Sequence, residues 1–170
     1  APNAPSLIPQ YPVGRQWFDL YPNGISFNEA GSAEKEILKQ DCLSSLNLIK
    51  DYINNLCIKY KLTHKDCFII GFSQGAMMAF EFGKYVNNTF AGCVLLSGRI
   101  LPSEDHEKKY FIKTPVLIVH GDQDTVLEPK YFEEACEILK NHGFLFDSYL
   151  MKNEGHTVSA ETLKLTKSFI

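Results

Sequence analysis

The chain has 170 residues, of which 45% are hydrophobic and 22% charged, and its formal net charge is −3. This length and composition are typical of a single globular domain, so residues 1–170 are interpreted as one domain. Nucleic acid is an unfavourable partner, because phosphate binding requires clustered Lys and Arg and no basic run is present. No apolar run approaches the roughly 18 residues of a membrane span.

Residues 1–27 are rich in Pro, Asn, Gly and aromatic residues and follow no sustained period, which predicts an irregular connection that begins with a short strand end. Residues 32–60 have apolar residues at steps of four and three, which predicts a helix that packs one face on a sheet. These apolar positions are Leu38, Cys42, Leu46, Ile49, Ile53, Leu56 and Tyr60.

The rest of the chain alternates short apolar runs with amphipathic segments. Buried strands are predicted at 67–72 and 91–97, and further strands at 114–120 and 144–151. Helices are predicted at 74–86, from Pro129 to Gly143, and from Ser159 onward. We expect the last helix to bury Leu163 and Phe169, and the polar residues 98–113 to form a surface excursion. Gly75, Ala79 and Gly83 leave a bare stripe on one helix face, which favours close packing on a sheet.

This alternation predicts an α/β fold with a mostly parallel sheet and helices on both faces. Functional sites in such sheets gather beyond the carboxyl ends of the strands. The five cysteines are an odd number without the close C-x-x-C spacing of zinc sites. Free, mostly buried thiols in a reducing compartment are expected, which favours a cytoplasmic protein.

Residues 71–75, Gly-Phe-Ser-Gln-Gly, match G-x-S-x-G between a predicted strand and a predicted helix. This is the context of a nucleophile elbow, where a strained turn lifts the serine hydroxyl into the crevice. We expect the flanking glycines to be required because side chains there would collide with the turn. Ser73 is therefore the candidate nucleophile.

A serine hydroxyl needs a base beside it, and in this fold the acid and then the histidine follow the serine in the chain. His156, in the loop after the last predicted strand, is preferred as the base over His142, which lies at a helix end. The candidate acids after the third strand are Asp122 and Asp124, with Glu128 as a weaker third. Spacing favours Asp124 only slightly, because Asp122 could instead bond backbone N–H groups in the turn.

Four segments, GRQWFDL, GFSQGAMMAF, HGDQDTVLEP and EGHTVS, occur in this order. Together they resemble the phospholipase/carboxylesterase family, which includes bacterial carboxylesterases and acyl-protein thioesterases, and the resemblance spans nearly the whole chain. It implies an α/β-hydrolase fold with Ser73 as nucleophile, Asp124 as orienting acid and His156 as base.

The resemblance also implies hydrolysis of small-molecule carboxylic esters or thioesters through an acyl-enzyme, without cofactor or metal. The backbone N–H of Gln74 would donate to the oxyanion, and Trp17 would line the substrate site. Ile100, Leu101, Val126 and Leu127 are further candidates for an acyl groove.

The sequence differs from the family pattern at its start. The family has a His-Gly segment upstream of its APNAP-like stretch, which supplies a second oxyanion donor. Here the sequence begins at APNAP, so we expect the first strands and this donor to be missing from a domain that is incomplete at its N-terminus. Loss of one donor typically lowers the rate about a hundred- to a thousandfold.

Other interpretations are weighed beside this one. The chain could be a truncated, weakly active or inactive hydrolase that acts at most as a binding module. Lysophospholipase and acyl-protein thioesterase activities both lie within the same family. A dienelactone hydrolase-like enzyme would carry Cys at the elbow, and Ser73 argues against it. Oligomeric state is not predicted.

Overall fold

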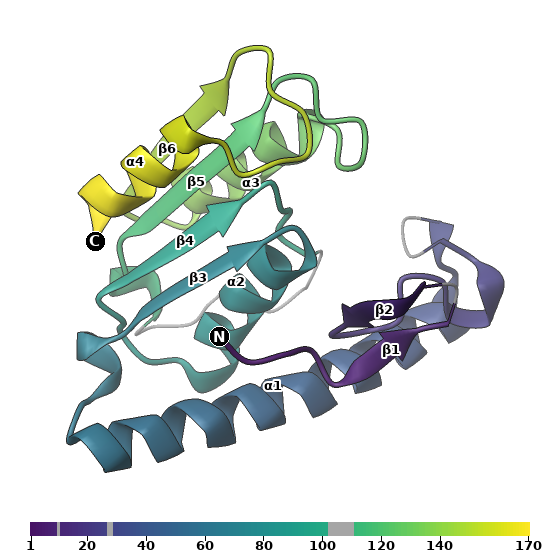
Figure 1. The fold of residues 1–170 in the computed structure, drawn as a ribbon, viewed down its shortest axis with the longest axis horizontal. Helices are drawn as coiled ribbons and strands as arrows, with labels where there is room; N and C mark the ends of the chain where they lie inside the picture. The colour runs from purple at the N-terminus through teal and green to yellow at the C-terminus, as the bar shows by residue number, and fades with distance from the viewer. Residues whose placement is uncertain (10, 27–28, 102–110) are drawn as a thin grey trace. The chain divides into compact units, whose positions relative to one another are not determined.

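A computed structural model of the protein describes residues 1–9, 11–26, 29–101 and 111–170. The described chain forms two compact units, residues 1–56 and residues 57–170 (Figure 1). None of the helices in these ranges is long and apolar enough to cross a membrane.

The first unit begins with an antiparallel pair of strands, β1 (Ser6–Ile8) and β2 (Tyr11–Gln16). The Arg15 guanidinium donates hydrogen bonds to the carbonyls of Ala4 and Pro5, beside strand β1. The prediction of an irregular connection over residues 1–27 was therefore wrong in part. The strands are short and interrupted by proline, so they lack the alternating pattern by which strands are recognised.

Helix α1 (Ser32–Tyr60) has the predicted bounds. Its predicted apolar face is the less exposed one, and Leu46, with 6% of its surface exposed, is the most buried apolar residue on it. Tyr60 is the exception, since 59% of its surface is exposed at the last turn of the helix.

The second unit contains a four-stranded sheet in the order β3-β4-β5-β6, with every neighbouring pair parallel. Its strands are β3 (Phe68–Phe72), β4 (Gly92–Leu96), β5 (Val116–Gly121) and β6 (Phe146–Met151). Its helices are α2 (Gln74–Val86), α3 (Lys130–Asn141) and α4 (Ala160–Phe169). Short 3₁₀ turns precede two of the strands, His64–Asp66 before β3 and Phe111–Lys113 before β5. The alternation of strands and helices predicted from the sequence is confirmed.

The helices cover both faces of this sheet. Helices α2 and α3 lie behind the sheet in Figure 1, and α4 lies in front. On the α4 side, apolar side chains of the central strands form a core cluster: Val94, Leu96, Leu117 and Val119, packed against Met151, Val158, Leu165 and Phe169. This confirms the layered α/β architecture and the packing of Phe169.

Three local predictions about burial were wrong. Strand β3 is not fully buried, because Phe72 is 38% exposed at the edge of the described sheet. In α4, Leu163 is 56% exposed, and the side that faces the sheet instead buries Thr162 and Thr166. Within the expected surface excursion, residues 102–110 lie outside the described residues, but Phe111 is fully buried.

The parallel arrangement places three loops at one edge of the sheet. Strands β3, β5 and β6 all run in the same direction, so the residues that follow them lie at their shared carboxyl edge. Ser73 directly follows β3, Asp124 follows β5, and His156 lies in the loop after β6. The fold thus brings together residues that are as many as 83 positions apart.

Candidate active site

Ser73 occupies a strained turn between β3 and α2. Its backbone has φ 54° and ψ −121°, a conformation that non-glycine residues adopt rarely. The backbone N–H of Ser73 donates to the carbonyl of Leu96 on the neighbouring strand, at 2.9 Å, which fixes the turn to the sheet. Although Ser73 is the N-cap of α2, its hydroxyl does not cap the helix. The hydroxyl instead points to a histidine.

The two glycines that flank Ser73 have different roles. A Cβ on Gly71 would overlap the backbone of Gly75 and Ala76, so no side chain fits there without movement. A Cβ on Gly75 would meet no atom within 4 Å. The prediction that both positions exclude a side chain is therefore right for Gly71 and wrong for Gly75, because the first turn of α2 offers its backbone, not its side chains, to the strand.

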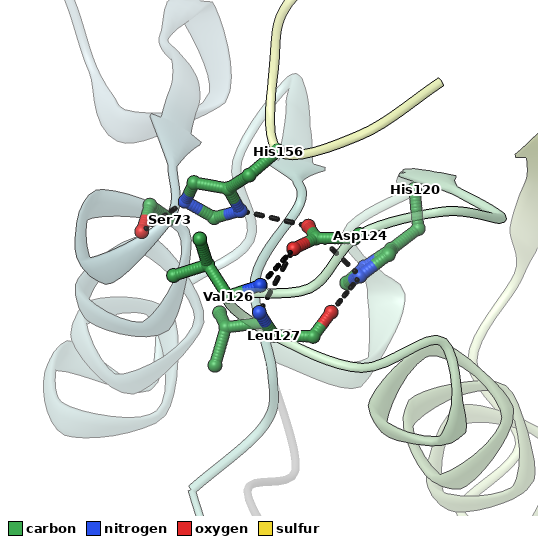
Figure 2. Close-up of polar contacts among 6 residues, drawn as sticks. All are labelled: Ser73, His120, Asp124, Val126, Leu127 and His156. Carbon is green, nitrogen blue, oxygen red and sulfur yellow. Dashed lines mark hydrogen bonds and ion pairs between the residues drawn. The ribbon is translucent and has the colours of Figure 1, made fainter. Parts of the chain in front are cut away.

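His156 lies between the serine and a carboxylate (Figure 2). Its Nε2 is 2.9 Å from Ser73 Oγ, and its Nδ1 is 2.7 Å from Asp124 Oδ2. The ring of Phe72 packs against the imidazole with 4.8 Å between ring centroids. The His156 side chain is 17% exposed, so a substrate can reach it from solvent.

The loop that holds His156 is seated on the end of β5. A Cβ on Gly121 would overlap the carbonyl of Glu154, and the backbone N–H of Gln123 donates to that same carbonyl at 2.9 Å. Close backbone approach at Gly121 therefore joins the Asp124 loop to the His156 loop. This contact explains why a glycine ends the strand.

The Asp124 side chain is fully buried, and its two carboxylate oxygens have different hydrogen-bond partners. Oδ1 accepts the backbone N–H groups of Val126 and Leu127, each at 2.9 Å, and Oδ2 faces His156. Burial acts to raise the pKa of Asp124, but the hydrogen bonds from His156, Leu127 and Val126 and the charge of His156 outweigh burial. The net effect lowers the pKa below its usual range, so the group is a carboxylate at neutral pH.

The rival acids and histidine have other surroundings. Asp122 Oδ1 accepts the backbone N–H of Asn153 at 2.7 Å, which is the turn-stabilising alternative considered from the sequence. The Glu128 side chain is 63% exposed and pairs with Lys130. His142 is the C-cap residue of α3, the helix end expected for it. Only Asp124 and His156 among these candidates are brought to Ser73.

Gln74 and Trp17, the two further predicted site residues, lie in separate units. Gln74 is the first residue of α2, directly after Ser73. Trp17 follows β2 in the first unit, where its carbonyl accepts a hydrogen bond from the Ser45 hydroxyl. Its neighbour Phe18 is buried in that unit. The roles of Gln74 and Trp17 in substrate binding remain predictions.

The arrangement can move a proton. With the proton of His156 on Nδ1, held by the Asp124 carboxylate, Nε2 is free to accept the Ser73 proton as the hydroxyl attacks a carbonyl carbon. The N-terminal end of α2 lies at the serine and favours negative charge. Among the described residues, no group of three His, Cys, Asp or Glu side chains is arranged to hold a metal ion.

Comparison with known proteins identifies the family. The model of the phospholipase/carboxylesterase family matches residues 1–170. The chain belongs to this family. The resemblance inferred from the four sequence segments is thereby confirmed.

Curated members of the family with similar sequences include acyl-protein thioesterases. The chain is 29% identical over 128 residues to acyl-protein thioesterase 1 homolog 1 of Dictyostelium discoideum, an alignment that covers 74% of this chain and 57% of that protein. It is 28% identical over 182 aligned positions to acyl-protein thioesterase 1 of Saccharomyces cerevisiae, covering 99% of this chain and 74% of that protein. The chain thus spans between about half and three quarters of the length of these family members.

Solved structures agree with the fold. Esterase PE8 has a TM-score of 0.83 and 26% identity, with 99% of this chain and 74% of that chain covered. The Bacillus cereus carboxylesterase, at 18% identity, has a TM-score of 0.75 over 98% of this chain and 72% of that chain, and this likeness shows the fold alone. The family's α/β-hydrolase fold is therefore present here.

Sequence reasoning missed two features of the site. The Phe72 ring contacts His156, although the only signal is its place as the variable residue of G-x-S-x-G. The second feature is His120, whose Nε2 lies 3.4 Å from Asp124 Oδ2 (Figure 2). Of the candidate acyl-groove residues, Ile100 and Leu127 are buried, whereas Val126 is 64% exposed, and Leu101 is half-buried.

Proposed function

We propose that the protein is a serine hydrolase of carboxylic esters or thioesters. The observation that supports this most strongly is the continuous pair of contacts from Ser73 Oγ to His156 Nε2 and from His156 Nδ1 to Asp124 Oδ2. Membership of the phospholipase/carboxylesterase family supports the same chemistry. Relatives named acyl-protein thioesterase 1 support a thioester substrate.

The proposed reaction has two halves. Ser73 Oγ attacks the acyl carbonyl while His156 takes its proton, and the resulting imidazolium then protonates the leaving alcohol or thiol. Water, deprotonated by His156, next attacks the acyl-enzyme and releases the carboxylic acid. Asp124 holds the imidazole in the required tautomer and stabilises its positive charge, and the N–H of Gln74 donates to the oxyanion.

The acyl chain is proposed to lie against apolar side chains at the mouth of the site. Val126 is exposed in the loop that also holds Asp124, and Phe72 is partly exposed beside the His156 ring. Trp17 is also proposed to contact the substrate, because the family resemblance implies this role. A cytoplasmic location is proposed because the cysteines are thiols, as is usual in a reducing compartment.

The test is hydrolysis of p-nitrophenyl acetate and of a palmitoyl thioester by wild type and by Ser73→Ala. Wild type is expected to hydrolyse at least one of them, and Ser73→Ala is expected to fall to the uncatalysed rate, with an unchanged unfolding midpoint. Ser44→Ala, at an exposed position of α1, is the matched control and should retain full activity. Folded wild-type protein that hydrolyses neither would contradict the proposal and favour a binding role.

A further inference from the structure

His120, a buried histidine outside the Ser73-His156-Asp124 triad, has contacts that suggest a part in its geometry. It lies near the end of strand β5 with 1% of its surface exposed. Its Nε2 is 2.8 Å from the carbonyl oxygen of Leu127 and 3.4 Å from Asp124 Oδ2. A carbonyl oxygen can only accept, so Nε2 carries a proton and donates it. The other ring nitrogen, Nδ1, is buried and has no hydrogen-bond partner among the described residues.

These contacts close a ring of interactions around the carboxylate. His120 donates to the Leu127 carbonyl, and the Leu127 N–H donates to Asp124 Oδ1. Both the carbonyl and the N–H of Leu127 are therefore hydrogen-bonded, which holds the loop from Asp124 to Leu127 in place. With Oδ1 fixed by the loop backbone, the carboxylate is oriented so that Oδ2 points to His156. Figure 2 shows His120 and His156 on opposite sides of the Asp124 carboxylate.

Burial of the His120 imidazole is unfavourable at one of its two ring nitrogens. A buried acceptor without a partner destabilises a folded protein by the desolvation of that atom, and Nδ1 of His120 is such an atom. The ring of Phe132 lies beside the imidazole, at 6.2 Å between centroids, and offers no hydrogen bond to the ring nitrogens. What a histidine adds is the Nε2–H donor toward Leu127.

We propose that His120 is a positioning residue of the triad, a neutral imidazole whose Nε2–H holds the Asp124–Leu127 loop and thereby directs Asp124 Oδ2 to His156. This inference deepens the proposed function and rests on it for its effect on turnover. Its structural content is independent of turnover and is measured separately.

The first test needs no substitution. Long-range ¹H–¹⁵N NMR of the histidine rings in the wild-type protein reports which nitrogen bears the proton. His120 is expected in the neutral Nε2–H tautomer, and the far-downfield Nδ1–H proton of His156 is expected to be visible because Asp124 shields it from exchange. A His120 ring that is charged or protonated on Nδ1 would overturn the proposal.

The second test compares two side chains of similar length, with and without the donor. His120→Gln keeps an N–H near the position of Nε2, and His120→Met has none. In His120→Met we expect loss or an upfield shift of the His156 Nδ1–H signal and a fall in kcat of about 10- to 100-fold, by analogy with outer-shell hydrogen bonds at metal sites, with KM little changed. His120→Gln should restore both readouts. If His120 had only a structural role, kcat would instead fall equally in both variants, and their unfolding midpoints would fall with it.

The outcomes separate the two proposals. Wild-type protein that shows the expected NMR signals but hydrolyses no ester or thioester would contradict the proposed function and leave the positioning role supported. A His120→Met variant that keeps the His156 signal and the wild-type kcat would contradict the positioning role while leaving the hydrolase intact.

Discussion

The backbone of Gly75 occupies the space that a side chain on Gly71 would need. This contact joins the end of β3 to the first turn of α2, and between them Ser73 is held at φ 54°. The strained serine conformation is therefore supported by close packing of two backbones. Substitution of Gly71 and of Gly75 is therefore expected to have different effects on stability.

Gly71→Ala should destabilise the protein, because the new methyl group would overlap the Gly75 carbonyl. Overpacking of this kind typically costs about 1–3 kcal/mol in free energy of unfolding, and more where backbone must move. Gly75→Ala is the matched control and should leave stability unchanged or raise it by about 0.5–1 kcal/mol, because alanine is the better helix former. Urea unfolding measures both. Equal destabilisation of the two variants would show that the elbow is not packed as described.

Asp124→Asn should lower kcat by about 10⁴-fold, as the equivalent change does in the Ser-His-Asp triad that serves as the general template. The amide NH₂ would face His156 Nδ1 and favour the wrong tautomer. Asp122→Asn keeps the oxygen that accepts the Asn153 N–H, so its activity should stay close to wild type. Steady-state kinetics of the pair decide between the two acids. A large loss in Asp122→Asn with little in Asp124→Asn would reverse the assignment.

Acid stability should depend on Asp124. Its pKa in the folded protein lies below the ordinary value of 3.8, so its ionised form stabilises the fold at pH above that value. This contribution is lost as the pH falls through the folded pKa. The difference in free energy of unfolding between wild type and Asp124→Asn should therefore shrink as the pH is lowered from neutral into this acid range. Urea titrations at a series of pH values test it, and a difference that stays constant with pH would contradict it.

Val126 should influence preference for acyl-chain length. Truncation to serine removes exposed apolar surface beside the site but keeps the backbone N–H that binds Asp124. Each methylene that loses its apolar contact loses up to about 0.8 kcal/mol, so kcat/KM should fall several-fold for octanoyl esters and little for acetyl esters. Leu145→Ser, at a 73% exposed position just before β6 and thus at the opposite edge of the sheet, is the control. An equal loss for both chain lengths in Val126→Ser would exclude this role.

Much of the second unit was predictable because its strands and helices have clear periodic patterns. Helix α2 has the bounds that the sequence indicated. Chain order and the loop position after the last predicted strand favoured His156 over His142, and His156 is the histidine that contacts Ser73. The choice between Asp122 and Asp124 was not predictable from spacing, because both residues follow the same strand. Only three-dimensional contacts show that Asp122 accepts the Asn153 N–H. The resemblance to the family, not the spacing, favoured Asp124 from the sequence, and the contact of Asp124 with His156 agrees with it.

Other features could not be predicted because they depend on tertiary context. In α4 the sheet-facing side buries Thr162 and Thr166, whose hydroxyls are satisfied locally, while Leu163 is exposed. A hydrophobicity pattern assigns the leucine to the core instead. His120 gave no sequence signal, because its effect depends on a carbonyl seven residues later in the chain.

The central claim is that the hydroxyl of Ser73 is an activated nucleophile, and reaction with a fluorophosphonate probe measures this most directly. Peptide mapping of the labelled wild-type protein should find the adduct on Ser73, and labelling should vanish in Ser73→Ala and fall steeply in His156→Ala. A folded wild-type protein that stays unlabelled, or that carries the adduct on another residue, would contradict the account.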